Sequence, residues 1–239
     1  RMSRGLGDVY KRQVLCLEGY AKLHEELLAA GKNSKKILCL GTTNSIGVYQ
    51  LPAVLQAARA ELPEMDVRFT VAFRSKIVSL LAAGKISLAI LPRAEDKKLP
   101  AGCLAVPLFR EEMALAVPAG HPLAGNSASL PDVCLLPFLV PESDSATRQF
   151  IGGLMKSRGM EAVKLLDFGN IEAIKQGILR GMGVSILPLS SIRRELASGE
   201  LARCRIDGVA LERTIDCVYR KNAPLTWCCL LYTSDAADD

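Results

Sequence analysis

Three short polar turns carry the side chains of this chain that are best suited to bind a small ligand. The first turn follows the apolar run 37–40 and Gly41, and it supplies Thr42, Thr43, Asn44 and Ser45 before a helix expected from Ile46. Backbone N–H groups at a helix start have no partner inside the helix, and the helix dipole adds positive potential there. Hydroxyl and amide groups beside them favour a small anion or carboxylate. The alternative is that Asn44 or Ser45 only caps its own helix.

The second and third turns, residues 143–148 and the segment around Asn170, also precede predicted helices. Their candidate ligand-binding residues are Ser143, Ser145, Thr147, Arg148 and Asn170. The guanidinium of Arg148 has a rigid set of N–H donors that matches a carboxylate, phosphate or sulfate. A helix dipole disfavours a cation in the first turn, so Arg148 is either a ligand-binding residue or an ordinary surface arginine. If two lobes face each other, the three turns converge on one cleft.

Residues suited to catalysis are sparse. The sequence has no GxSxG, GxGxxG or P-loop motif. His24 falls in an apolar helical stripe and His121 in the loop-like segment PAGHPL, which favours packing and loop roles. The acidic pairs Glu95-Asp96 and Glu111-Glu112 adjoin Lys or Arg, which predicts solvated charges and not a catalytic carboxylate pair. We therefore expect no enzymatic activity and no cofactor.

The eight cysteines show neither a CxxC motif nor a histidine at metal-ligand spacing. Several lie in apolar runs, where a free thiol behaves as a small hydrophobic group. This pattern predicts neither a metal site nor a disulfide scaffold, and free thiols favour a reducing, cytoplasmic compartment. No apolar run approaches the roughly 20 residues of a membrane span, and the net charge of +5 is too mild to indicate a nucleic-acid surface.

The elements that must position the polar turns alternate strictly between strand and helix patterns. After the first turn come a helical stripe through Leu62, a strand at 67–71, a helix ending at Gly84 and the apolar strand 88–91. Two strands, 104–109 and 113–117, follow. Strands at 138–140, 163–168, 184–187, 201–206 and 213–219, with helices between, complete the pattern. The sequence predicts an α/β protein with two lobes, joined by extended crossovers.

The two ends of the chain differ from this pattern. Residues 1–13 and 227–239 show no amphipathic period, and we expect them to be non-native additions. Residues 14–30 carry an apolar stripe at helical spacing, with Gly31 as a candidate helix end. This helix either pairs with a partner helix or packs on its own domain.

Taken together, residues 14–226 resemble the effector-binding part of LysR-type transcriptional regulators. The matching segments include LCLGTTNSIGVYQLPAVLQAARAELPEMDVRF, KIVSLLAAGKISLAIL, LAVPLFREEMALAVPAGHPLA, SDSATR and DFGNIEAIKQGILRGMGVSILP. The resemblance implies two Rossmann-like lobes of the type II periplasmic-binding-protein kind, with two crossover strands. It divides the chain into a partial linker helix for dimerisation (14–33), lobe I (36–112 plus 207–226) and lobe II (113–206).

By this resemblance, the inducer contacts fall on residues 42–45, on Ser143, Ser145, Thr147 and Arg148, and on Asn170, which replaces a usual Ser or Thr. The family's N-terminal winged helix–turn–helix is absent from the chain, so DNA binding is expected only through that missing part. The implied protein is a cytoplasmic homodimer or tetramer that senses a small, anionic effector.

Two other functions remain open at this stage. A solute-binding protein of a transporter shares the fold, but it would need a signal sequence and few thiols. A dehydratase-like enzyme would need an acid/base pair in the cleft. The polar turns offer little beyond hydroxyls, amides and one arginine.

Overall fold

A computed structural model describes residues 36–61, 63, 65–94, 97–162 and 164–221. The predicted linker helix 14–33, both predicted non-native ends and the pair Glu95-Asp96 lie outside these residues. The chain divides into two compact units. Within the described residues, unit 1 comprises 36–72, 76–109 and 216–221, and unit 2 comprises 73–75 and 110–215.

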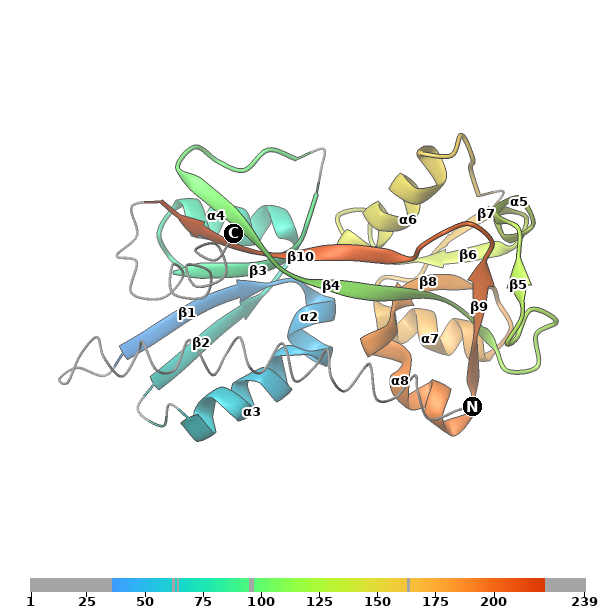
Figure 1. Cartoon of the computed structure of the whole chain (residues 1–239), viewed down its shortest axis with the longest axis horizontal. Coiled ribbons are helices and arrows are strands. Elements are labelled where there is room, and N and C mark those ends of the chain that lie inside the picture. Colours follow the sequence, from blue (N-terminus) through green and yellow to red (C-terminus); the bar gives the residue numbers. More distant parts are fainter. Residues whose placement is uncertain (1–35, 62, 64, 95–96, 163, 222–239) are drawn as a thin grey trace, which may run out of the picture. The chain divides into compact units, whose positions relative to one another are not determined.

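Unit 1 is built on a parallel sheet. Strand β1 (Lys36–Thr42) pairs with β2 (Met65–Val71) on one side and β3 (Leu88–Pro92) on the other, and β10 (Glu212–Arg220) follows β3. Figure 1 shows helix α4 (Arg74–Ala82) on one side of these strands, and α2 (Asn44–Tyr49) and α3 (Leu51–Glu61) on the other. A β-strand followed by a helix that covers the sheet is the arrangement that alternating patterns predict.

The core of unit 1 lies between α4 and the sheet. Ile77 and Leu81, one turn apart on α4, are fully buried against Ile86, Ala89, Leu91 and Val218. Gly41 lies under this helix, where a Cβ would approach the Ile77 side chain to 2.8 Å. The absence of a side chain at Gly41 therefore lets α4 pack directly on the end of β1.

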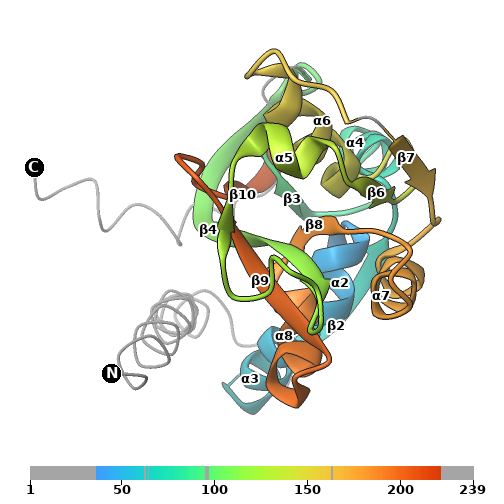
Figure 2. The same cartoon turned by 90° about the vertical axis from the view of Figure 1, so that its right-hand side faces the viewer.

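Unit 2 combines antiparallel and parallel pairing. Strand β4 (Cys103–Pro118) pairs with β8 (Ser185–Pro188) and β9 (Leu201–Ile206), both antiparallel. Strand β5 (Ser127–Ala128) pairs with β9 in parallel. Strands β6 (Pro137–Val140) and β7 (Lys164–Asp167) form a parallel pair. Helices α6 (Ala146–Lys156) and α7 (Ile171–Leu179) lie on opposite sides of β6 and β8, as Figures 1 and 2 show. Two further helices are α5 (Leu130–Cys134) and α8 (Leu189–Ser198).

The core of unit 2 is dominated by side chains that are completely buried, including Leu115, Val133, Phe138 and Ile186. Helix α7 comes unusually close to the strands. A Cβ on Gly177 would lie 2.7 Å from the side chains of Leu139 and Phe168. This close contact fixes the position of α7, and with it the turn at its N-terminus.

Two strands carry the chain from one unit to the other. Strand β4 crosses between Phe109 and Arg110, and β10 crosses between Ile215 and Asp216. The prediction of two strands at 104–109 and 113–117 is wrong, because β4 is one strand of 16 residues. The charged residues between them interrupt the apolar pattern but stay extended. Each of these charges pairs across the sheet: Arg110 with Glu212, Glu111 with Arg213, and Glu112 with Arg203.

The structure adds local details that the sequence analysis did not predict. Helix α5 and strand β5 were not predicted, because five and two residues are too short to show a period. Helix α8 has no side-chain cap at its N-terminus. It starts at Leu189, and the Ser191 hydroxyl donates to the Pro188 carbonyl at 2.7 Å. No helix among the described residues is long and apolar enough to span a membrane.

Candidate ligand-binding site

The first polar turn lies at the carboxyl end of β1 in unit 1. Thr42 is fully buried, and its hydroxyl donates to the Ile90 carbonyl of β3 at 2.8 Å. Thr43 is 6% exposed, and its Oγ1 is buried with no hydrogen-bond partner among the described residues. A buried hydroxyl without a partner is costly, so Thr43 Oγ1 is a place where a bound molecule would be stabilised.

The helix after this turn starts earlier than the sequence predicts. Helix α2 begins at Asn44, not Ile46, so Asn44 and Ser45 lie inside its first turn and neither is the cap. Thr43 is the N-cap residue, but its side chain makes no capping hydrogen bond. Asn44 is exposed and Ser45 is buried. The capping alternative is therefore wrong for this turn.

The second and third polar turns lie beside each other in unit 2. They follow β6 and β7, whose parallel pairing ends with Val140 opposite Asp167. Beyond the strands the contact continues, because the N–H of Phe168 donates to the Val140 carbonyl at 2.9 Å. The N–H of Glu142 donates to the Gly169 carbonyl at 3.2 Å. Helices α6 and α7 therefore begin next to each other.

Each of these two helices has a side-chain cap. Ser145 Oγ accepts from the N–H of Thr147 at 3.2 Å, and Asn170 Oδ1 accepts from the N–H of Ala173 at 3.0 Å. Asn170 is therefore the N-cap residue of α7. Thr147 is buried, whereas Ser143 and Asn170 are exposed. Two capped helix starts at one sheet edge concentrate positive potential there.

Arg148 stands in the first turn of α6, next to both helix starts. Its Nη1 donates to the Pro141 carbonyl at 3.1 Å and to Oδ1 of Asp167. The Arg148 side chain is 28% exposed, and that of Asp167 is 71% exposed. Nε and Nη2 of Arg148 have no hydrogen-bond partner in the described part of the chain. The open edge of the guanidinium is suited to a carboxylate or phosphate.

The structure thus brings together the predicted residues of unit 2, which are Ser143, Ser145, Thr147, Arg148 and Asn170. The predicted residues of unit 1, 42–45, form a separate turn on β1. That both sets face one cleft stays a prediction. Unit 2 also has an open hollow of about 100 Å³, lined by Pro118, His121, Leu136, Pro137, Gly181, Gly183 and Val184.

Comparison with known proteins identifies the family. Residues 32–227 match the family described as "LysR substrate binding domain". This chain belongs to the LysR substrate binding domain family. The resemblance found in the sequence is therefore confirmed, and with it the α/β fold of two lobes.

Individual relatives of this LysR domain are distant. A protein of Cyanophora paradoxa named "Probable RuBisCO transcriptional regulator" is 25% identical over 189 residues, which cover 77% of this chain and 58% of that protein. The chain thus spans less than two thirds of the length of this relative.

Two solved structures share the fold of the LysR domain. The Synechocystis PCC6803 CcmR regulatory domain in complex with 2-PG has a TM-score of 0.70 at 23% identity, covering 80% of this chain and 92% of that one. The effector-binding domain of QuiR in complex with shikimate has a TM-score of 0.66 at 22% identity, covering 81% and 92%. At these identities the likeness shows the fold alone.

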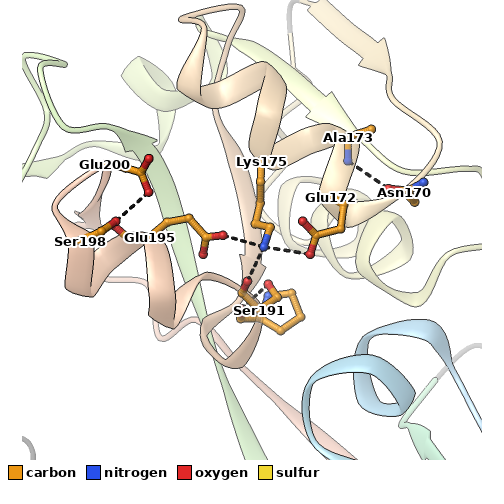
Figure 3. Close-up of polar contacts among 9 residues, drawn as sticks. Asn170, Glu172, Ala173, Lys175, Ser191, Glu195, Ser198 and Glu200 are labelled. Atoms are coloured by element: carbon orange, nitrogen blue, oxygen red, sulfur yellow. Dashed lines mark hydrogen bonds and ion pairs between the residues drawn. The ribbon is translucent and has the colours of Figure 1, made fainter.

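The LysR domain also contains a buried cation that the sequence analysis missed. Lys175 lies on α7, and its side chain is 6% exposed. Its ammonium contacts Glu195 Oε1 at 2.7 Å, Glu172 Oε1 at 2.9 Å and the Ser191 carbonyl at 3.2 Å, as Figure 3 shows. The three contacts tie α7 to α8. The signal was present in the sequence, because Lys175 falls within the apolar stripe 171, 174 and 178.

The environment of Lys175 stabilises its charged form. Burial alone would lower the pKa of Lys175, but the hydrogen bonds that its ammonium donates to Glu195 and Glu172, together with their negative charges, outweigh burial and raise that pKa. Lys175 therefore stays protonated at neutral pH and acts as a structural cation. It holds α7, whose first turn carries the Asn170 cap.

The prediction that Glu111 is a solvated charge is wrong. Its side chain is 4% exposed, and Oε2 contacts Nε and Nη2 of Arg213 at 2.6 Å. The sequence could not reveal this pairing, because the partner is 102 residues away on β10. Glu112 is a solvated charge, as predicted, since its side chain is 49% exposed and pairs with Arg203.

Three thiols of the LysR domain, those of Cys103, Cys134 and Cys204, are poor nucleophiles. Burial raises the pKa of Cys134, and burial with the charge of Asp207 raises that of Cys204. Burial also raises the pKa of Cys103, partly offset by Arg220. A thiol with a raised pKa reacts slowly at neutral pH. The described residues include no group of three or more potential metal ligands among His, Cys, Asp and Glu.

Proposed function

We propose that this chain is the effector-sensing part of a LysR-type transcriptional regulator and that it binds a small anion. The observation that carries the proposal is the arrangement at the ends of β6 and β7. There the N-termini of α6 and α7 lie side by side with the Arg148 guanidinium. Two helix dipoles and one guanidinium attract a carboxylate or phosphate, and the open Nε–Nη2 edge of Arg148 can bind it through two hydrogen bonds.

The first turn is the part of the proposed site that lies in unit 1. We propose that residues 42–45 contact the same ligand as Ser143, Ser145, Thr147, Arg148 and Asn170, with Thr43 as the key residue of unit 1. Its buried hydroxyl has no partner among the described residues, and a ligand oxygen would satisfy it. Asn44 is exposed beside it and offers an amide.

The two solved complexes support a ligand of this class. Shikimate, bound by the QuiR domain, is a carboxylate, and the CcmR domain binds 2-PG. The family match and the named regulator among its relatives favour this function over a solute-binding protein or an enzyme. A catalytic role would need an acid/base pair, and Glu111, the buried carboxylate named in the sequence analysis, is paired with Arg213.

The remaining parts of the proposed function concern the whole protein. We propose that DNA binding belongs to a region of the regulator outside this chain, that the regulator works as a homodimer or tetramer, and that it resides in the cytoplasm. Effector binding would act by favouring one arrangement of the regulator over another, since a ligand shifts only an equilibrium between states that it binds differently.

Calorimetry with defined anions tests the proposed site. Shikimate, 2-PG and inorganic phosphate would each be titrated into the wild-type chain, Arg148→Ala and Arg158→Ala. Arg158 is an exposed arginine just beyond the other end of α6 and serves as the matched control. We expect at least one anion to bind, and Arg148→Ala to weaken it by more than about 10-fold, the scale of a lost charge-assisted hydrogen bond. Equal affinity in all three proteins would exclude Arg148 from the site.

A further inference from the structure

The guanidinium that is proposed to bind the effector already has an anionic partner within the chain. Asp167 is the last residue of β7, and its carboxylate accepts from Nη1 of Arg148, which stands in the first turn of α6. Nη1 also donates to the Pro141 carbonyl at 3.1 Å. One edge of the guanidinium is therefore occupied by the protein, and the Nε–Nη2 edge is open among the described residues.

This arrangement has two opposite effects on a bound anion. The contacts to Pro141 and Asp167 hold the guanidinium in place, which lowers the ordering cost of binding. The negative charge of Asp167, however, cancels much of the positive charge of Arg148 and repels a second anion on the open edge. The first effect needs only a hydrogen-bond acceptor at position 167, whereas the second needs a charge.

We infer that Asp167 sets the anion affinity of Arg148: it positions the guanidinium and at the same time weakens the binding of any anion that lacks further contacts. This inference rests on the proposed function. Its consequence is selectivity, because an ion such as phosphate gains little from Arg148 alone. An effector that also contacts the two helix starts gains further hydrogen bonds that offset the repulsion.

The substitution Asp167→Asn separates the two effects. The amide oxygen of the substituted side chain would keep an acceptor for Nη1, but the negative charge would be gone. The Asp167 side chain is 71% exposed, so the substitution leaves no buried gap. Asp144→Asn is the matched control, because Asp144 is an exposed acid in the same turn as Arg148 and its substitution makes the same change in net charge.

The reactivity of Arg148 toward phenylglyoxal, mapped by peptide mass spectrometry on the full chain, measures both predictions. We expect Asp167→Asn to speed modification of Arg148 at least about twofold, the lower end of the effect of a partly exposed ion pair, and Asp144→Asn to leave it unchanged. Inorganic phosphate and shikimate should protect Arg148. The concentration for half protection should be about two- to fivefold lower in Asp167→Asn than in the wild type.

The possible failures point to different causes. An equal modification rate in the wild type and Asp167→Asn would overturn the inference, while the calorimetric test of Arg148→Ala would still stand. Faster modification without protection by either anion would show that Arg148 binds no such ligand, and the proposed function would fail together with the inference. If Asp144→Asn speeds the modification of Arg148 as much as Asp167→Asn does, only the net charge matters, and the inference is overturned as well.

Discussion

Replacing Lys175 by methionine should destabilise unit 2 by about 2 kcal/mol. Removing one partner of a fully buried ion pair costs roughly 3–5 kcal/mol, because the remaining charge stays buried without compensation. Here the side chain of Glu195 is 17% exposed and that of Glu172 is 59% exposed. Glu172 can return to water, so its contact adds less than about 1 kcal/mol. Glu195 is only partly hydrated, and Oε2 of Glu195 already lacks a hydrogen-bond partner among the described residues. The expected loss of stability is therefore about 2 kcal/mol, below the roughly 3–5 kcal/mol of a fully buried ion pair.

Urea unfolding followed by circular dichroism measures this loss. With a slope of about 2 kcal/mol per molar urea, the midpoint should fall by about 1 M. Lys164→Met, a substitution of an exposed lysine on β7, is the control and should change stability by less than about 0.5 kcal/mol. The double variant Lys175→Met/Glu195→Leu should recover most of the loss, since no charge is left buried. A loss under about 0.5 kcal/mol, or no recovery in the double variant, would refute the reasoning.

The pH dependence gives the same prediction a second test. The pKa of Lys175 is raised in the folded protein, so its stabilising effect is fully present below the unfolded-state pKa of about 10.4. The effect is lost as the pH rises through the higher pKa of the folded state. The stability difference between the wild type and Lys175→Met should therefore be constant from about pH 6.5 to 9 and shrink above about pH 10.5. A difference that already shrinks between pH 7 and 9 would contradict a raised pKa.

Three further predictions concern packing, hydrogen bonding and thiol reactivity. Gly177→Ala should lower the free energy of unfolding, measured in urea, by about 1–3 kcal/mol, because the added Cβ would lie 2.7 Å from two side chains. Gly152 has open space around it, so the control Gly152→Ala should not destabilise the protein. Thr42→Val should cost about 1–2 kcal/mol by the same measurement, since a buried carbonyl would lose its hydroxyl donor; an unchanged midpoint would contradict this. Burial raises the pKa of Cys134 and Cys204. Iodoacetamide at pH 7.5 should therefore modify both thiols at least about 10-fold more slowly than it modifies the thiol of glutathione. Equal modification rates would contradict this prediction.

The sequence predicts most of the fold because periodicity carries most of the information. Buried strands such as Leu88–Pro92 read as unbroken apolar runs, and α6 and α7 follow capping residues in the sequence. The single strand β4 was predicted as two, because the charges at 110–112 look like a turn until their partners are known. Those partners lie about 90 or more residues away, and one sequence alone does not reveal them.

The candidate site shows the same division between local and distant information. That polar residues precede α6 and α7 is local, and the cap by Asn170 follows from it. The hydrogen bond from Arg148 to Asp167 depends on the pairing of β6 with β7, and the sequence does not specify this pairing. The burial of Lys175 was visible in its apolar stripe, but its partner Glu195 lies on the next helix.

The central claim, that residues of both units bind one small anion, is tested most directly by backbone amide chemical shifts. The chain would be titrated with the anion of highest affinity among shikimate, 2-PG and inorganic phosphate. We predict that the largest shift changes fall on residues 42–45, 143–148 and 170 and saturate at one common ligand concentration. Changes confined to other residues, such as those lining the hollow at His121, or two sets with different saturation points, would contradict a single site.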